Sequence, residues 1–228
     1  MVILESQIDK HRISDFSRET FEGRIEVVDT LREAEKAVEF LNKQKFLGLD
    51  TETKPVFRKN TSPKKVALLQ IATENICFLF RLNYIGLPPA LIDLLSSDAH
   101  MKVGLSFHDD IRALRMRGDF QMGKWIDLQR MARELGIMDQ SLQKIYANVF
   151  HRFISKSQRL SNWEVDVLTD AQKKYAATDA WACLNLYNKF QELKRSHDYV
   201  IKEKISTSLL IDRFIADILQ KEKKINYV

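Results

Sequence analysis

The chain has 228 residues, of which 45% are hydrophobic and 29% charged, and its formal net charge of +5 permits a polyanionic partner without requiring one. This length is enough for one domain with its own core, and two cysteines, Cys77 and Cys183, are too few for a disulfide framework and are predicted to be core residues. The sequence has no zinc-ligand pattern, no signal-peptide pattern and no apolar run of about twenty residues, so we expect a cytoplasmic protein without a membrane span.

The first half of the chain is predicted to contain most of the strands. Residues 1–23 have weak periodicity and are expected to form an N-terminal arm. Thr30 and Glu33 have the spacing of a capping box, which begins an amphipathic helix. Thr73–Glu74 is predicted to be a hairpin turn, so the strands around it are expected to form an antiparallel meander. The strands are predicted at 24–28, 46–50, 65–72 and 75–82.

The second half is predicted to be mostly helical. Pro88 and Pro89 open one helix, and a second capping box, Thr169 and Gln172, opens a longer one. Two more strands are predicted at 102–106 and 125–128. The remaining helices are predicted to begin at Asp109 or Asp110 and to extend over 128–135, 140–149, 169–194 and 206–222. This order of elements is typical of an α/β domain with a mixed sheet flanked by helices.

The predicted elements suggest three parts: an N-terminal arm at 1–23, a domain at 24–195 and a C-terminal helical extension at 196–228. The extension carries an apolar stripe, which is expected to dock on the domain, with a contact between copies of the chain as the alternative. The stripe consists of Leu209, Leu210, Phe214, Ile218 and Leu219.

Asp50 and Glu52 lie two residues apart at the end of a predicted strand. Residues at this spacing extend from the same face of a strand, so both carboxylates can bind one metal ion. Such a pair also occurs by chance in a chain of this size. An apolar strand that runs directly into two acids is nevertheless a poor way to build a core, which favours a site.

Further acids follow on helices. Asp110 lies where a strand leads into a helix, so it is either a site residue or a group that satisfies the helix N-terminus, although Asp109 suits the N-cap better. Tyr175 and Asp179 are four residues apart and share one helical face. An acid on an apolar stripe needs a partner, which is either the Tyr175 hydroxyl within the core or a metal ion. In the second case Tyr175 would orient the water that attacks phosphorus.

The acids belong to three blocks of sequence, Gly48–Glu52, Val103–Leu114 and Ser161–Ala180, and a fourth block, Lys65–Ile71, lies between the first two. With these blocks the chain resembles the DEDDy class of 3′–5′ exonucleases, the family of ribonuclease D and the Werner-syndrome exonuclease domain. The resemblance implies an α/β, ribonuclease H-like fold, in which helices flank a mixed β-sheet (the DnaQ-like exonuclease fold).

The resemblance also implies two divalent metal ions, Mg²⁺ or Mn²⁺, roughly 4 Å apart, and a nucleic acid 3′ end as the substrate. Asp50, Glu52 and Asp179 would bind the first ion. Asp110 would hold the second mainly through water, and Asp50 would bridge the two. Tyr175 would position the attacking water, and the product would be a nucleoside 5′-monophosphate.

Two stretches beside these blocks contain cations and no acids. They are expected to bind phosphates on either side of the metal site, with solvated loops as the alternative. The candidate residues are Arg58, Lys59, Lys64, Arg152, Lys156 and Arg159. Trp163 either packs beneath the site or is an ordinary core residue.

Two rival functions remain open at this point. A non-catalytic nucleic-acid-binding module could retain the fold, although the complete set of acids favours an enzyme. An endonuclease or transferase on a similar sheet would explain the acids but not Tyr175. The sequence does not choose between DNA and RNA, because that choice depends on contacts to the 2′-hydroxyl.

Overall fold

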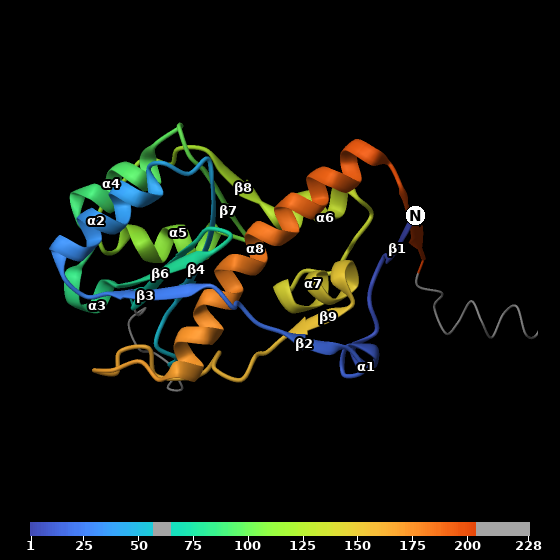
Figure 1. Cartoon of the computed structure of the whole chain (residues 1–228), viewed down its shortest axis with the longest axis horizontal. Coiled ribbons are helices and arrows are strands. Elements are labelled where there is room, and N and C mark those ends of the chain that lie inside the picture. Colours follow the sequence, from blue (N-terminus) through green and yellow to red (C-terminus); the bar gives the residue numbers. More distant parts are fainter. Residues whose placement is uncertain (57–64, 204–228) are drawn as a thin grey trace, which may run out of the picture.

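A six-stranded mixed sheet forms the centre of the protein (Figure 1). The computed structural model describes residues 1–56 and 65–203. β4, β5 and β6 are antiparallel neighbours, which confirms the predicted meander, and the other adjacent strands are parallel. Across the sheet the strands are β3 (Arg24–Val28), β6 (Ile76–Arg81), β5 (Leu68–Ala72), β4 (Phe46–Glu52), β7 (Met101–Gly104) and β8 (Trp125–Asp127).

Helices cover both faces of this sheet. The long helix α8 (Asp170–Ser196) runs diagonally across one face, as Figure 1 shows, and packs on β4 and β5. α6 (Leu128–Glu134) and α7 (Leu142–Phe150) pack beside α8. The opposite face forms an apolar core with α2 (Leu31–Leu41), α4 (Pro89–Ser96) and α5 (His108–Arg115).

Local sequence signals set the starts of several helices. Both predicted capping boxes are confirmed, with Thr30 and Thr169 as the N-cap residues of α2 and α8. One prediction is wrong: α5 begins at His108 with Phe107 as its N-cap, so Asp109 does not cap the helix. Asp109 instead lies in the first turn, where an acidic side chain interacts favourably with the helix dipole. The short helix α3 (Leu82–Ile85) is not predicted by the sequence.

Four short strands form two further sheets that the sequence does not predict. β1 (Val2–Glu5) lies parallel to β10 (Tyr199–Lys202), and β2 (Ser17–Glu19) lies parallel to β9 (Arg152–Ile154). Between β1 and β2 the chain forms the short helix α1 (Lys10–Ile13). Strands of three or four residues are too short to show a clear period, and each pairs with a partner far away in the sequence.

β10 lies in the segment that is expected to be a helical extension, so the first part of this segment is a strand instead. The predicted helix at 206–222 and its apolar stripe lie outside the described residues. Cys77 and Cys183 are buried and free, as predicted for core residues. In the part of the chain that the structure describes, no helix combines the length and apolar character that a membrane crossing requires.

Candidate active site

The first two acids extend from the end of β4 toward α8. Asp50 and Glu52 alternate with Leu49, which packs into the core on the opposite face of the sheet. Gly48 explains how α8 comes this close to the strand, because a Cβ atom at Gly48 would lie 2.1 Å from the Ala180 carbonyl oxygen. The glycine two residues before Asp50 therefore sets the distance between the strand and the helix at the level of the acids.

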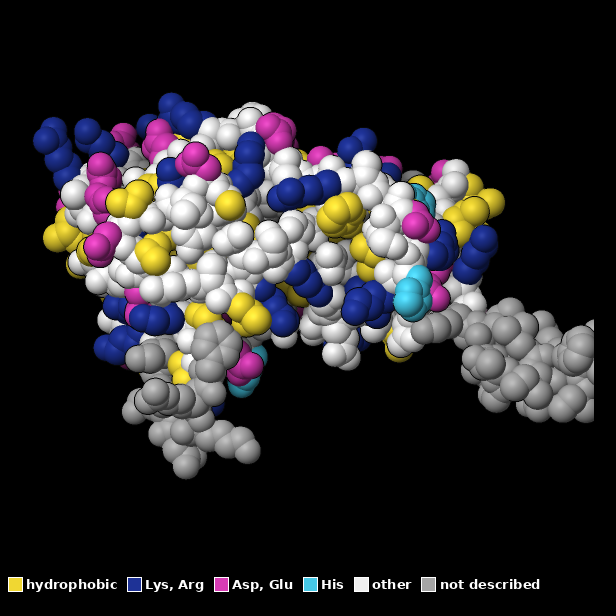
Figure 2. All heavy atoms as spheres, turned by 90° about the horizontal axis from the view of Figure 1, so that it is seen from below, with side chains coloured by type: hydrophobic (Ala, Val, Ile, Leu, Met, Phe, Trp, Pro, Cys, Tyr) yellow, Lys and Arg dark blue, Asp and Glu magenta, His cyan; other side chains and the backbone are white. Residues whose placement is uncertain are grey.

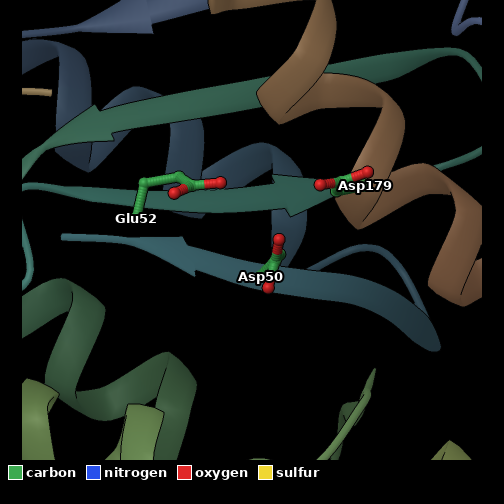
Figure 3. Close-up of side chains that lie close together, drawn as sticks. All are labelled: Asp50, Glu52 and Asp179. Carbon is green, nitrogen blue, oxygen red and sulfur yellow. The ribbon is translucent and has the colours of Figure 1, made fainter. Parts of the chain in front are cut away.

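The third acid, Asp179, meets the first two from α8. Figure 3 shows the carboxylates of Asp50, Glu52 and Asp179 directed toward a common space between strand and helix. One oxygen from each lies within 4.8 Å of the others. Carboxylate oxygens are the ligands that Mg²⁺ and Mn²⁺ prefer, so this donor set fits a divalent cation.

The electrostatics of the three acids also favour a cation. Burial, with the nearby charges of Asp179 and Asp110, raises the pKa of Asp50 well above its usual value. Burial and the Asp50 carboxylate raise the pKa of Glu52 to about 10. Burial raises the pKa of Asp179 to about 7, against the lowering effect of its hydrogen bond from Tyr175 and of the Lys156 charge. Three ionised carboxylates this close would repel one another, so without a cation their protonated forms are favoured, and a divalent cation between them would offset the repulsion.

Asp110 lies beside this group but outside it. Its carboxylate accepts a hydrogen bond from the hydroxyl of Thr51, the residue between Asp50 and Glu52. Burial raises the pKa of Asp110, and its own charge contributes to the raised pKa of Asp50. The structure thus brings three of the four predicted acids to one point and places the fourth next to them, held by strand β4.

Tyr175 faces Asp179 along α8, as the spacing of four residues predicts. Its hydroxyl donates a hydrogen bond to the Asp179 carboxylate. The ring packs against Trp163, with 5.9 Å between the ring centroids. Trp163 is fully buried, so it is a core residue that also supports the tyrosine from below.

The predicted cations divide into three groups. Lys156 and Arg159 line a cavity of about 260 Å³ together with Asp50, Tyr175 and Asp179. Arg152 does not line this cavity; its guanidinium pairs with the Glu19 carboxylate at 3.4 Å on the strand β9. Arg58, Lys59 and Lys64 lie outside the described residues. Figure 2 shows Lys and Arg side chains in dark blue across the face of the molecule seen from below.

Sequence reasoning misses the other walls of the cavity. Leu105, after β7, and the N-terminal turn of α7, with Ser141, Leu142 and Gln143, also line it. The Gln143 side-chain amide donates a hydrogen bond of 2.9 Å to the backbone oxygen of Ile154, which ties α7 to β9. These residue types are common on helix starts and loops, so the sequence holds no signal that could have identified them.

The comparison with known protein families decides which family this arrangement belongs to. Residues 25–194 match the family described as 3′–5′ exonuclease. The chain belongs to this exonuclease family. The match includes all but the first residue of the sheet from β3 to β8 and nearly all of α8, and it contains Asp50, Glu52, Asp110, Tyr175 and Asp179.

Relatives of the exonuclease match most of the chain. A 3′–5′ exonuclease of Arabidopsis thaliana is 29% identical over 201 residues, which cover 82% of this chain and 70% of the relative. Exonuclease 3′–5′ domain-containing protein 2 of Drosophila melanogaster is 32% identical over 67% of this chain and 27% of its own length. The bifunctional 3′–5′ exonuclease/ATP-dependent helicase WRN of mouse is 31% identical over 64% of this chain and 11% of its own length. The chain thus spans only a minor part of the last two proteins.

Solved structures support the exonuclease fold. The Nibbler EXO domain of Aedes aegypti superposes with a TM-score of 0.72 at 20% identity and covers 79% of this chain and 94% of its own. Ribonuclease D of Escherichia coli superposes with a TM-score of 0.68 at 20% identity, over 76% of this chain and 46% of its own. Together with the mixed sheet, these similarities confirm the predicted ribonuclease H-like α/β fold.

Proposed function

We propose that this exonuclease uses two divalent metal ions to hydrolyse nucleic acid from the 3′ end and releases nucleoside 5′-monophosphates. The observation that carries the proposal is the convergence of the Asp50, Glu52 and Asp179 carboxylates within 4.8 Å, next to the Tyr175 hydroxyl. Hard oxygen ligands on a rigid strand and a long helix are suited to hold Mg²⁺ or Mn²⁺.

Each residue has a role in this proposal. Asp50, Glu52 and Asp179 hold the ions, and Asp110, oriented by the Thr51 hydroxyl, contributes from the side of Asp50. When bound, two such ions supply the Lewis acidity that activates a water and offsets charge on the leaving 3′ oxygen. Tyr175 positions the water, since a hydroxyl can donate one hydrogen bond and accept another.

Lys156 and Arg159 complete the site by binding phosphate. Both side chains line the same cavity as Asp50 and Asp179, so a nucleic acid strand whose 3′ end enters this cavity brings its phosphates next to them. Their positive charges stabilise a phosphodiester, whose own charge would otherwise be repelled by the carboxylates. The structure of Trypanosoma brucei RNase D in complex with RNA U12 superposes on this chain with a TM-score of 0.65 at 21% identity. This similarity is one of fold.

The test is digestion of a 3′-labelled single strand in Mg²⁺ or Mn²⁺, with chromatography of the products. We expect mononucleotides with a 5′-phosphate from the wild type, loss of product in EDTA, and release from Asp50→Asn that is slower by about 10³-fold. Equal release by the wild type and Asp50→Asn would refute the proposal in favour of a non-catalytic module. Cleavage of a circular strand would instead support an endonuclease, and matched DNA and RNA oligomers in the same assay would identify the preferred substrate.

A further inference from the structure

The N-terminal segment, residues 2–22, precedes the residues that match the exonuclease family, yet it is firmly attached to the domain. Asn148 on α7 exchanges two hydrogen bonds with the backbone of Glu5, of 2.9 Å from the Glu5 amide and 2.7 Å to the Glu5 carbonyl. A segment held by backbone hydrogen bonds and buried apolar side chains is a fixed part of the fold. Its buried apolar residues are Leu4, Ile8, Ile13 and Phe21.

β2 of this segment pairs with β9, the strand that precedes Lys156 and Arg159 in the sequence. Among the described residues, β2 is the one strand that pairs with β9, and Glu19 lies opposite Ile154 in the register. Ile154 lines the active-site cavity, and Lys156 follows it by two residues. The cation-bearing wall of the cavity therefore takes its position from the N-terminal segment.

The segment is attached a second time, on α8 beside the acids. The Phe21 amide donates a hydrogen bond of 3.1 Å to the Thr178 hydroxyl, and the Lys174 ammonium donates one of 2.7 Å to the Phe21 carbonyl. Lys174 and Thr178 are the chain neighbours of Tyr175 and Asp179. The N-terminal segment is thus fixed on both sides of the candidate active site.

Arg18 lies between these two attachments, at the edge of the site. It lines a small hollow together with Ser155 and Tyr175, and these same two residues also line the active-site cavity. Ser155 and Tyr175 therefore border both the hollow that Arg18 lines and the cavity that Asp50 and Asp179 line.

The positive charge of Arg18 is not compensated by its surroundings. The Glu19 carboxylate pairs with Arg152 at 3.4 Å, and the Glu22 carboxylate pairs with Lys174 at 3.2 Å. Arg18 itself is exposed, and within residues 1–56 and 65–203 it forms no ion pair. An unpaired guanidinium beside a phosphodiester site is well suited to bind phosphate.

We propose that the N-terminal segment forms one wall of the substrate site and that Arg18 binds a backbone phosphate of the nucleic acid strand, upstream of the phosphate that is hydrolysed. The proposal rests on the proposed exonuclease function. It extends the substrate-binding site beyond the residues that match the family, so that this site includes residues 2–22.

Binding tests the proposal without hydrolysis. The fluorescence anisotropy of a labelled single strand is titrated with Asp50→Asn protein at several salt concentrations. Introducing Arg18→Ala into this protein removes one phosphate contact. It is expected to reduce the slope of log Kd against log salt by about 0.7 and to weaken binding about fivefold at roughly 0.1 M salt. Arg18→Lys should retain most of the slope because it keeps the charge. Lys36→Ala, which removes an exposed cation from α2 on the other face of the sheet, is the matched control and should leave the slope unchanged.

Hydrolysis gives the second readout, through two substrates of different length. The p-nitrophenyl ester of thymidine 5′-monophosphate contains only the phosphodiester that is cleaved, whereas an oligonucleotide also carries upstream phosphates. Arg18→Ala should lower the ratio of kcat/KM on the oligonucleotide to that on the ester about fivefold. An unchanged salt slope, or an equal loss on both substrates, would overturn the proposal. A reduced salt slope in a protein that cleaves neither substrate would refute the proposed function and leave phosphate binding by Arg18 intact.

Discussion

The acidic centre (Asp50, Glu52 and Asp179) and the cationic wall (Lys156 and Arg159) meet at one cavity, which Asp50 and Asp179 line from the acidic side, but they are built in different ways. The acids lie on a seven-residue strand and a 27-residue helix, which pack directly on each other. The cations follow a three-residue strand whose pairing partner comes from the N-terminal segment. The acidic centre therefore depends on the packing of one helix on one sheet, whereas the cationic wall depends on residues that are far apart in the sequence.

The largest expected effect comes from the acidic centre. Asp50→Asn should lower kcat/KM by about 10³-fold, because the proposed metal ions would contribute several kcal/mol of transition-state stabilisation and each roughly 1.4 kcal/mol is a factor of ten. Steady-state hydrolysis of a labelled strand measures the loss. Asp109→Asn removes an exposed acid next to Asp110 and is the matched control, with activity expected near that of the wild type. A comparable loss in both variants would show that the position of the acid does not matter.

The contact that brings the acids together is the next largest test. Gly48→Ala would place a Cβ atom 2.1 Å from the Ala180 carbonyl oxygen, so α8 must shift away from β4. We expect a loss of about 1–3 kcal/mol in the free energy of unfolding, together with weaker Mn²⁺ binding. Urea denaturation and calorimetric titration measure the two quantities. Gly118→Ala is the control, because its nearest neighbours would lie at 3.5 Å, an ordinary contact distance.

Removing a charge from the acidic centre should have opposite effects on stability and on metal binding. Asp179→Asn keeps an acceptor for the Tyr175 hydroxyl but relieves the repulsion among the buried carboxylates. In EDTA and at a pH above about 7, where Asp179 is ionised, the variant should be more stable than the wild type by about 1–2 kcal/mol. Added Mn²⁺ should raise the melting temperature of the wild type and have little effect on the variant. A variant that is less stable than the wild type in EDTA would contradict the electrostatic account of the site.

Substitutions at the cationic wall should give the smallest effects. They should also distinguish Lys156 from Arg152, which are close in the sequence but lie in different surroundings. Lys156→Ala is expected to weaken the binding of a single strand about fivefold at roughly 0.1 M salt, as the loss of one phosphate contact predicts. Arg152→Ala should change binding by less than about twofold, because its ion pair with Glu19 is partly exposed and lies outside the cavity. Anisotropy titrations compare the two variants directly. Equal losses of affinity in the two variants would mean that Arg152 also binds the nucleic acid.

Local rules predict the two halves of the acidic centre, whereas the meeting of these halves is implied only by the family resemblance. A spacing of two residues on a strand places Asp50 and Glu52 on one face, and a spacing of four on a helix places Tyr175 next to Asp179. The sequence alone does not show why position 48 requires a glycine. The Ala180 carbonyl becomes the neighbour of Gly48 only when α8 packs on β4. Long elements with a clear period are therefore predictable, while the contacts between them are not.

The cationic wall shows where sequence reasoning fails. Arg152, Lys156 and Arg159 are close in the sequence, yet β9 turns Arg152 toward Glu19 and leaves the other two in the cavity. The N-terminal segment is expected to be an arm because its strands are too short to show a period. Their pairing with β9 and β10 is a tertiary property, which no local pattern encodes.

The central claim is that Asp50, Glu52 and Asp179 bind divalent ions at one point. The most direct measurement is anomalous diffraction from a crystal soaked in Mn²⁺ with a nucleoside 5′-monophosphate. The account predicts two manganese peaks roughly 4 Å apart, with ligands from these three carboxylates and the second peak on the side of Asp110. A map without manganese among these oxygens, or with the three side chains turned away from one another, would contradict it.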